Sequence, residues 1–113
     1  MPQQKHLIIN ADCDNNLMFN SIPAIYELMK DIVKIFDFAN LTLPYIIKGV
    51  ENKPGLSGFI IVENSYVSIH SYKEDRKVFL DIFSCKNFEH ERVLEFLKQK
   101  FYSNEFNFEI IER

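Results

Sequence analysis

The chain has 113 residues, 47% of them hydrophobic, and a formal net charge of −3 at pH 7. This length predicts one domain spanning residues 1–113, and the slight acidic balance argues against nucleic-acid binding through a basic patch. No apolar run approaches the roughly 18 residues of a membrane-spanning helix. The two cysteines, Cys13 and Cys85, form neither a metal-binding spacing nor a disulfide framework, and Met1 leads straight into a strand pattern rather than a signal peptide. We therefore expect a cytoplasmic protein with free thiols.

The first third of the chain predicts a strand followed by a helix. Residues 5–10 form a short apolar run typical of a central strand, and the polar residues 11–20 suggest a turn. Ser21 is a candidate N-cap, and Pro23 is tolerated in the first helical turn. Apolar side chains then recur at the spacing of one helical face: Ile25, Leu28, Met29, Ile32, Ile35 and Phe36. We expect this helix to end just before Asn40.

The middle of the chain predicts mainly strands. Residues 41–50 are mostly apolar but contain Pro44, which favours an edge or irregular strand because proline cannot donate a ladder hydrogen bond. Three further strands are expected at residues 59–63, 66–72 and 77–83. Their short connections predict that they are neighbours in the sheet and antiparallel.

The last quarter predicts a second helix and a final strand. Asn87 can cap a helix over residues 88–101, whose acidic first turn and basic last turn suit the helix dipole. Residues 105–112 alternate apolar and polar side chains and indicate a strand. The order of elements predicts an α+β fold, a two-layer sandwich in which two helices pack on one face of an antiparallel β-sheet.

Four reactive side chains fall in the stretch between residues 53 and 86. They are Ser57, Ser65, His70 and Cys85. Strand alternation puts His70 on the same face as Tyr66, and a neutral imidazole can accept a proton near pH 7. Residue types alone favour purely structural roles: two turn serines, a hydrogen-bonded strand histidine and a small buried cysteine.

The spacing of these residues resembles that of the bacterial and archaeal S-adenosylmethionine decarboxylases, which are pyruvoyl-dependent enzymes. Residues 55–58 (G-L-S-G) match the first block of the family pattern, and Ser65 falls at the position of its self-cleaving serine. Residues 68–70 (S-I-H) and 81–85 (D-I-F-S-C) match the later blocks without insertion. The start of the chain, residues 6–9 followed by an acidic turn with a cysteine, is also similar.

The resemblance implies a self-processing reaction. The Ser65 hydroxyl would attack the carbonyl of Asn64, and elimination from the resulting ester would cleave the chain and convert Ser65 to a pyruvoyl group. That group would form a Schiff base with the substrate amine and accept electrons as CO₂ leaves. His70 matches the histidine that removes the serine α-proton, and Ser57 matches a serine that supports processing.

Two more residues acquire roles from the resemblance. Cys85 matches the cysteine that returns a proton to the substrate α-carbon, and Glu74 matches a carboxylate that binds the ribose hydroxyls. Asp12, Cys13 and Asp14 are interpreted as turn residues, because three consecutive side chains rarely converge on one ion, so no metal site is expected.

Four positions depart from the family pattern. Asn64 stands where the family has Glu, Tyr66 follows the serine where the family has His, and Lys73 replaces a turn proline. Glu51 occupies the position of the aromatic residue that stacks on adenine, with Tyr45 as a candidate substitute.

The expected function is decarboxylation of S-adenosylmethionine for spermidine synthesis, by a homodimer of cleaved protomers. One alternative is a pyruvoyl-dependent decarboxylase of arginine or ornithine on the same fold, which loss of the adenine-stacking aromatic would suit. The other is an uncleaved, non-catalytic paralogue that regulates an active partner, suggested by Asn64 and Tyr66. Retention of the four reactive side chains argues against the paralogue.

Overall fold

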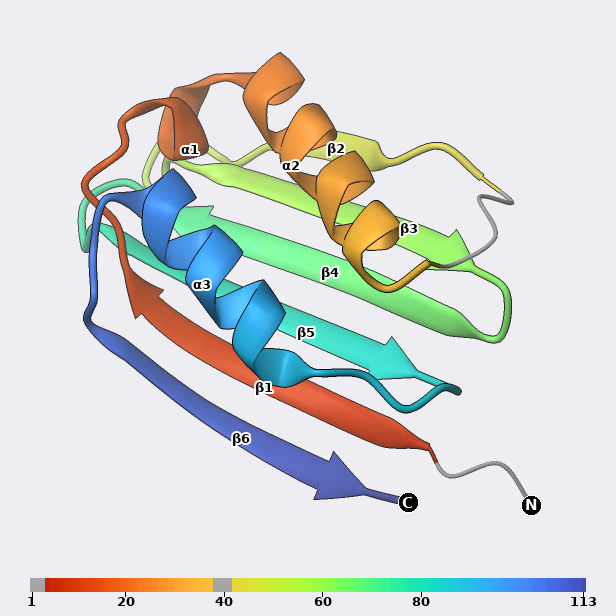
Figure 1. Ribbon diagram of the computed structural model, residues 1–113. Coiled ribbons are helices and arrows are strands. Elements are labelled where there is room, and N and C mark those ends of the chain that lie inside the picture. The colour runs from red at the N-terminus through yellow and green to blue at the C-terminus, as the bar shows by residue number, and fades with distance from the viewer. Residues whose placement is uncertain (1–3, 38–41) are drawn as a thin grey trace.

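The computed structural model describes residues 4–37 and 42–113 as one antiparallel sheet with helices on one of its faces (Figure 1). The elements are β1 (Lys5–Asp12), α1 (Leu17–Asn20), α2 (Ile22–Ile35), β2 (Tyr45–Lys48), β3 (Leu56–Val62), β4 (Ser65–Tyr72), β5 (Lys77–Ser84), α3 (His90–Phe101) and β6 (Phe106–Glu112). The six strands are ordered β2-β3-β4-β5-β1-β6. The α+β expectation is confirmed, with one short helix more than predicted. None of the helices in the described part of the chain is long and apolar enough to cross a membrane.

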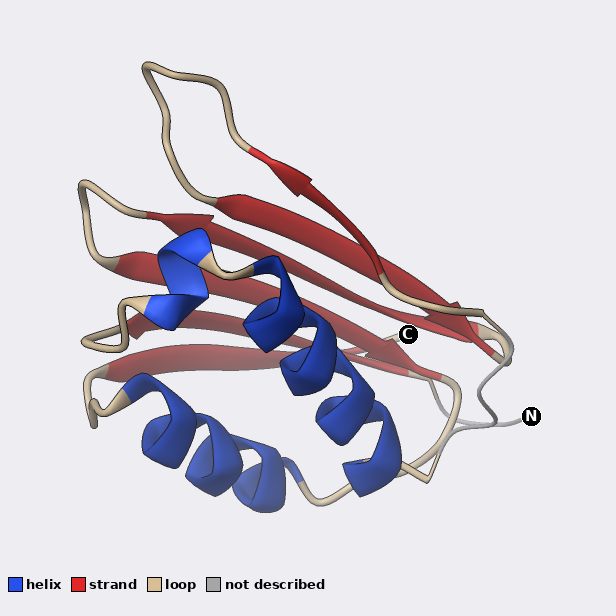
Figure 2. Cartoon of the chain, turned by 90° about the horizontal axis from the view of Figure 1, so that it is seen from above, coloured by secondary structure: helices blue, strands red, loops and turns tan. Residues whose placement is uncertain are grey.

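Within the described residues the helices cover only one face of the sheet, and Figure 2 shows them together on that side. We call the helix-covered side the inner face and the opposite side the outer face. Alternate residues of each central strand are buried on the inner face, as the period of two in a strand requires. They include Leu7 and Ile9 of β1, Val67 and Ile69 of β4, and Leu80 of β5, all at most 1% exposed.

Helices α2 and α3 supply the other half of the core. Ile25, Met29 and Ile32 of α2 are fully buried, as the helical spacing predicts. On α3, Phe101 is fully buried, and its ring lies 5.8 Å from the ring of Phe106 on β6. Each helix therefore buries a single apolar stripe against the inner face.

The first long helix begins where the sequence predicts. The Ser21 hydroxyl accepts a hydrogen bond from the Ala24 N–H at 3.2 Å, and Pro23 lies in the first turn. The helix ends at Ile35. Asn40, expected just beyond the helix, and Leu41, expected to start the next strand, lie outside the described residues. The edge strand itself is β2, at the end of the sheet.

The predicted start of α3 is wrong. The helix begins at His90 with Glu89 at the N-cap position and no side-chain capping bond, instead of beginning at Phe88 after Asn87. The reason is a tertiary contact: the Phe88 ring packs edge-on against the Phe36 ring at 4.7 Å between centroids. This aromatic contact holds Phe88 outside the helix.

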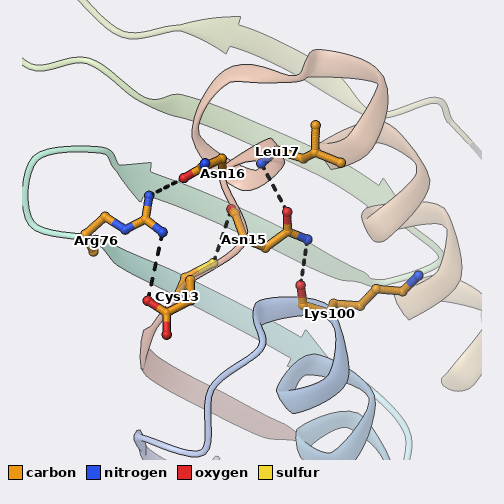
Figure 3. A network of polar contacts seen from close by, with 7 residues as sticks. Cys13, Asn15, Asn16, Leu17, Arg76 and Lys100 are labelled. Atoms are coloured by element: carbon orange, nitrogen blue, oxygen red, sulfur yellow. Dashed lines mark hydrogen bonds and ion pairs between the residues drawn. The ribbon is translucent and has the colours of Figure 1, made fainter.

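Residues 11–20 were predicted as a turn, but β1 continues to Asp12 and the short helix α1 follows. A polar network fixes this segment (Figure 3). The Asn15 amide donates to the Lys100 carbonyl at 2.8 Å and its oxygen accepts from the Leu17 N–H at 3.1 Å. Arg76 donates to the Asn16 side chain at 2.6 Å. The network ties α1 to the end of α3 and to the β4–β5 turn.

Removing the Phe101 side chain should test how much the inner-face core contributes to stability. Phe101→Ala leaves a cavity at a fully buried position and should lower the free energy of unfolding by about 3–5 kcal/mol. Phe108→Ala is the matched control, since Phe108 is 46% exposed, and it should cost no more than about 1 kcal/mol. Urea unfolding of both variants measures the difference, and equal losses would contradict this description of the core.

Candidate active site

Ser57 and His70 form a direct contact across the β3–β4 hairpin. The register places them opposite each other, and Ser57 Oγ lies 2.7 Å from His70 Nδ1. Ser57 belongs to strand β3 rather than to the glycine-flanked turn considered above. Strand β3 begins at Leu56, directly after Gly55, where a Cβ atom would lie 1.8 Å from the Ser71 carbonyl oxygen, so no side chain fits there. Both side chains lie on the outer face, and we call them the Ser57–His70 pair.

Ser65 and Cys85 form a second contact at the other end of the hairpin. Ser65 is the first residue of β4, pairs with Val62, and is 3% exposed. Its Oγ accepts a hydrogen bond from the Cys85 N–H at 3.0 Å. Cys85 directly follows β5 and is partly buried. We call these residues the Ser65–Cys85 pair.

The two pairs lie far apart within one chain. His70 lies five positions after Ser65 along β4, which corresponds to about 17 Å of strand. An odd separation also puts the two side chains on opposite faces of the sheet. Within one chain, His70 therefore does not contact the serine that it is predicted to serve, and we call the two pairs the half-sites of the candidate site.

The turn between β3 and β4 contains the predicted cleavage point. Because Val62 pairs with Ser65, only Glu63 and Asn64 form the turn. Glu63 has φ of 48°, in the left-handed region that costs a residue with a Cβ atom about 1–2 kcal/mol. Strained backbone of this kind occurs at functional sites. The sequence does not predict the left-handed conformation of Glu63, because neither Gly nor Asn, the residues that favour it, occupies that position.

An aromatic cluster covers part of the outer face beside Ser65. The Tyr66 ring is stacked between Phe59, at 5.5 Å, and Phe83, at 5.7 Å, and His6 meets Tyr66 edge-on at 6.1 Å. Phe59 and its neighbour Ile61 are exposed. This departure from the family pattern, a tyrosine after the serine, therefore contributes a ring to an uncovered apolar surface.

The predicted substrate residues lie at the end of the sheet that carries the Ser57–His70 pair. Glu74 is exposed in the β4–β5 turn and Glu51 is exposed in the β2–β3 loop. The two segments are joined by a hydrogen bond from the Lys73 N–H to the Pro54 carbonyl at 3.0 Å. Tyr45 lies elsewhere, opposite Phe59 on the edge strand β2 and away from the loop that holds Glu51.

The acidic residues around Cys13 are held by cations of the chain itself. Asp12 pairs with Lys77, and Asp14 lies 3.9 Å from Arg76. Within residues 4–37 and 42–113, no group of three His, Cys, Asp or Glu side chains is placed to hold a metal ion. Burial raises the pKa of the Cys13 thiol above its ordinary value.

The two thiols should differ in reactivity. Cys13 is 1% exposed and has a raised pKa, so both access and thiolate content are low at about pH 8, whereas Cys85 is partly exposed. Iodoacetamide should label Cys85 at least about tenfold faster in the folded protein, and urea should remove the difference. Peptide mass mapping measures both rates. Equal labelling of the two cysteines in the folded chain would contradict the burial of Cys13.

Comparison with known proteins gives one consistent result. A family model described as S-adenosylmethionine decarboxylase matches residues 5–113. The chain is similar to an S-adenosylmethionine decarboxylase proenzyme of Clostridium botulinum (strain Langeland), with 27% identity over 97 residues that cover 83% of this chain and 79% of the relative. It is also similar to a proenzyme of the same description from Archaeoglobus fulgidus, with 29% identity over 89 residues, 77% of this chain and 80% of the relative.

A solved structure has the same fold. The crystal structure of the adenosylmethionine decarboxylase from Aquifex aeolicus superposes with a TM-score of 0.81 and 15% sequence identity, over 97% of this chain and 89% of that chain. At 15% identity the superposition shows the fold alone, whereas the match to the family model shows the family. The chain belongs to the S-adenosylmethionine decarboxylase family.

Proposed function

We propose that this chain is the proenzyme of a pyruvoyl-dependent S-adenosylmethionine decarboxylase that cleaves itself between Asn64 and Ser65. The observation that carries the proposal is the position of Ser65 directly after a strained two-residue turn, with its hydroxyl oxygen 3.0 Å from the Cys85 backbone nitrogen. Family membership supplies the reaction class. Processing is supported by the relatives from Clostridium botulinum and Archaeoglobus fulgidus, which are themselves proenzymes by name.

Cleavage begins with addition of Ser65 Oγ to the carbonyl carbon of Asn64. The carbon–nitrogen bond then breaks, the hydroxyl proton goes to the nitrogen, and an ester results. A base next removes the Ser65 α-proton while the Cβ–oxygen bond breaks, so Asn64 leaves as a carboxylate. Water then replaces the remaining nitrogen, which leaves as ammonia, and the new terminal residue is a pyruvoyl group. Each step uses only the chain and one water molecule.

The residues around Ser65 fit a pyruvoyl group. Ser65 is 3% exposed, so a group formed there is shielded from bulk water, and the partly buried Cys85 thiol follows an N–H that already contacts the serine. A pyruvoyl group supplies a carbonyl that takes up the substrate amine and accepts the electron pair left by CO₂. We assign to Cys85 the return of a proton to the substrate α-carbon.

The separation of the half-sites supports a homodimer. His70 is assigned as the base that removes the Ser65 α-proton, with Ser57 orienting its imidazole, but the two residues are about 17 Å apart along β4. A two-fold axis that crosses the strands between two outer faces would bring the Ser57–His70 pair of one chain over the end of the sheet that carries Ser65 in the other chain. It would form two sites per dimer and bury the aromatic cluster of Phe59, Tyr66 and Phe83.

One observation favours a second candidate substrate class. Glu51 and Glu74 lie on two segments joined by a backbone hydrogen bond, at the end of the sheet with the Ser57–His70 pair. Two carboxylates there could receive the guanidinium or ammonium of arginine or ornithine. The family match nevertheless favours S-adenosylmethionine, with Glu74 accepting hydrogen bonds from the ribose hydroxyls.

Processing should be observable as chain cleavage and should complement between chains. The wild type should give two fragments, residues 1–64 and 65–113, the second with a blocked N-terminus, whereas Ser65→Ala and His70→Ala should each stay intact when expressed alone. When the two variants are co-expressed, the His70→Ala chain should be cleaved, because the Ser65→Ala partner supplies its histidine. Intact mass spectrometry distinguishes the chains.

Two outcomes would contradict this design. A wild-type chain that keeps its full-length mass over days would remove the enzyme proposal and leave the non-catalytic paralogue. A His70→Ala chain that cleaves alone at the wild-type rate would show that the histidine is not the processing base. Co-expression of His70→Ala with Ser57→Ala is the matched control, because those side chains belong to the same half-site.

Substrate choice should follow from CO₂ release by the cleaved protein. Carboxyl-labelled S-adenosylmethionine should release CO₂, and arginine and ornithine should release none. Glu74→Gln should raise the KM for S-adenosylmethionine roughly 2- to 10-fold, the worth of one hydrogen bond, with little change in kcat. Release from arginine or ornithine alone would instead establish the second candidate, and Glu51→Gln would then be expected to weaken that substrate.

A further inference from the structure

One short segment holds both sides of the bond between Asn64 and Ser65. The Cys85 N–H donates to Ser65 Oγ at 3.0 Å, after the bond. The next residue, Lys86, places its Nζ 3.1 Å from Glu63 Oε1, before the bond. The segment is itself fixed by Ser84, whose Oγ accepts from the Lys86 N–H at 3.0 Å and donates to the Lys86 carbonyl at 2.8 Å.

Lys86 also reaches a third element. Its Nζ donates to the Asp37 carbonyl at 3.0 Å, just beyond the end of helix α2. The ammonium thus links the left-handed residue Glu63 to the end of a packed helix. A backbone in the left-handed region persists only where the surroundings hold it, and this ion pair is a contact that does so.

We propose that Lys86 is a positioning residue for self-cleavage, acting through the Glu63 carboxylate to hold the turn in the conformation in which Ser65 Oγ meets the Asn64 carbonyl. The inference rests on the proposed function, since it concerns the rate of the same reaction. The Ser65 hydroxyl is held by the Cys85 N–H. Its distance from the Asn64 carbonyl therefore depends on where the turn residues Glu63 and Asn64 lie. Placing reacting atoms is a recognised part of catalysis.

The test compares cleavage rates of freshly expressed chains by intact mass. Lys86→Met and Glu63→Gln should each slow cleavage about 5-fold, the upper range for a partly exposed ion pair, and the double variant should be no slower than either. Lys86→Arg should keep the wild-type rate, and the charge swap Glu63→Lys with Lys86→Glu should restore part of it. Lys100→Met is the matched control, because its ammonium contacts the Phe96 ring away from the turn.

The outcomes separate this inference from the proposed function. If the wild type cleaves but Lys86→Met cleaves equally fast, or if the Lys86→Met and Glu63→Gln effects multiply, Lys86 does not act through Glu63. A slow Lys86→Met chain with an equally slow Lys86→Arg chain would likewise overturn the inference, because the charge would not be what matters. A wild-type chain that never cleaves would remove the proposed function and the inference with it.

Discussion

The pairing register between β3 and β4 is the constraint on which the candidate site depends. The Val62–Ser65 pair closes a two-residue turn, and each step back along β3 is matched by one step forward along β4 until Ser57 meets His70. A slip of one residue would turn every side chain of the hairpin to the other face. The same register that creates the Ser57–His70 contact also forces Ser65 to the far end of the strand.

Covering the sheet on only one face has a consequence for assembly. The helices bury the inner face, and none of the described helices or strands covers the outer face. Stacked aromatic rings lie there, and one of them belongs to Tyr66, the residue after Ser65. Exposed apolar surface of this kind marks an interaction site in soluble proteins. In the proposed homodimer, a second copy would both cover this apolar surface and supply the catalytic residues that Ser65 does not contact within one chain.

Much of the fold follows from local patterns, because strand alternation, the Ser21 cap and the α2 stripe need no long-range information. The Ser57–His70 contact is also implied by the sequence, once the turn at Asn64 is placed. The start of α3 was missed because a contact between Phe36 and Phe88 decides it. The Lys86–Glu63 ion pair was missed for the same reason, since residues distant in sequence meet only after β5 has docked on β4.

The strand order gives cleavage at Asn64 an unusual mechanical outcome. The first fragment would contain β1, β2 and β3, and the second would contain β4, β5 and β6. In the sheet, however, β1 lies between β5 and β6. The two fragments would be interleaved, because three strand pairs join them: β3 with β4, β1 with β5, and β1 with β6. Separating the fragments would require β1 to leave its place between β5 and β6. Once unfolded, they would have to find each other by diffusion, so refolding would become concentration-dependent. Cleavage in this one turn would thus leave the folded state intact but make refolding after unfolding much slower.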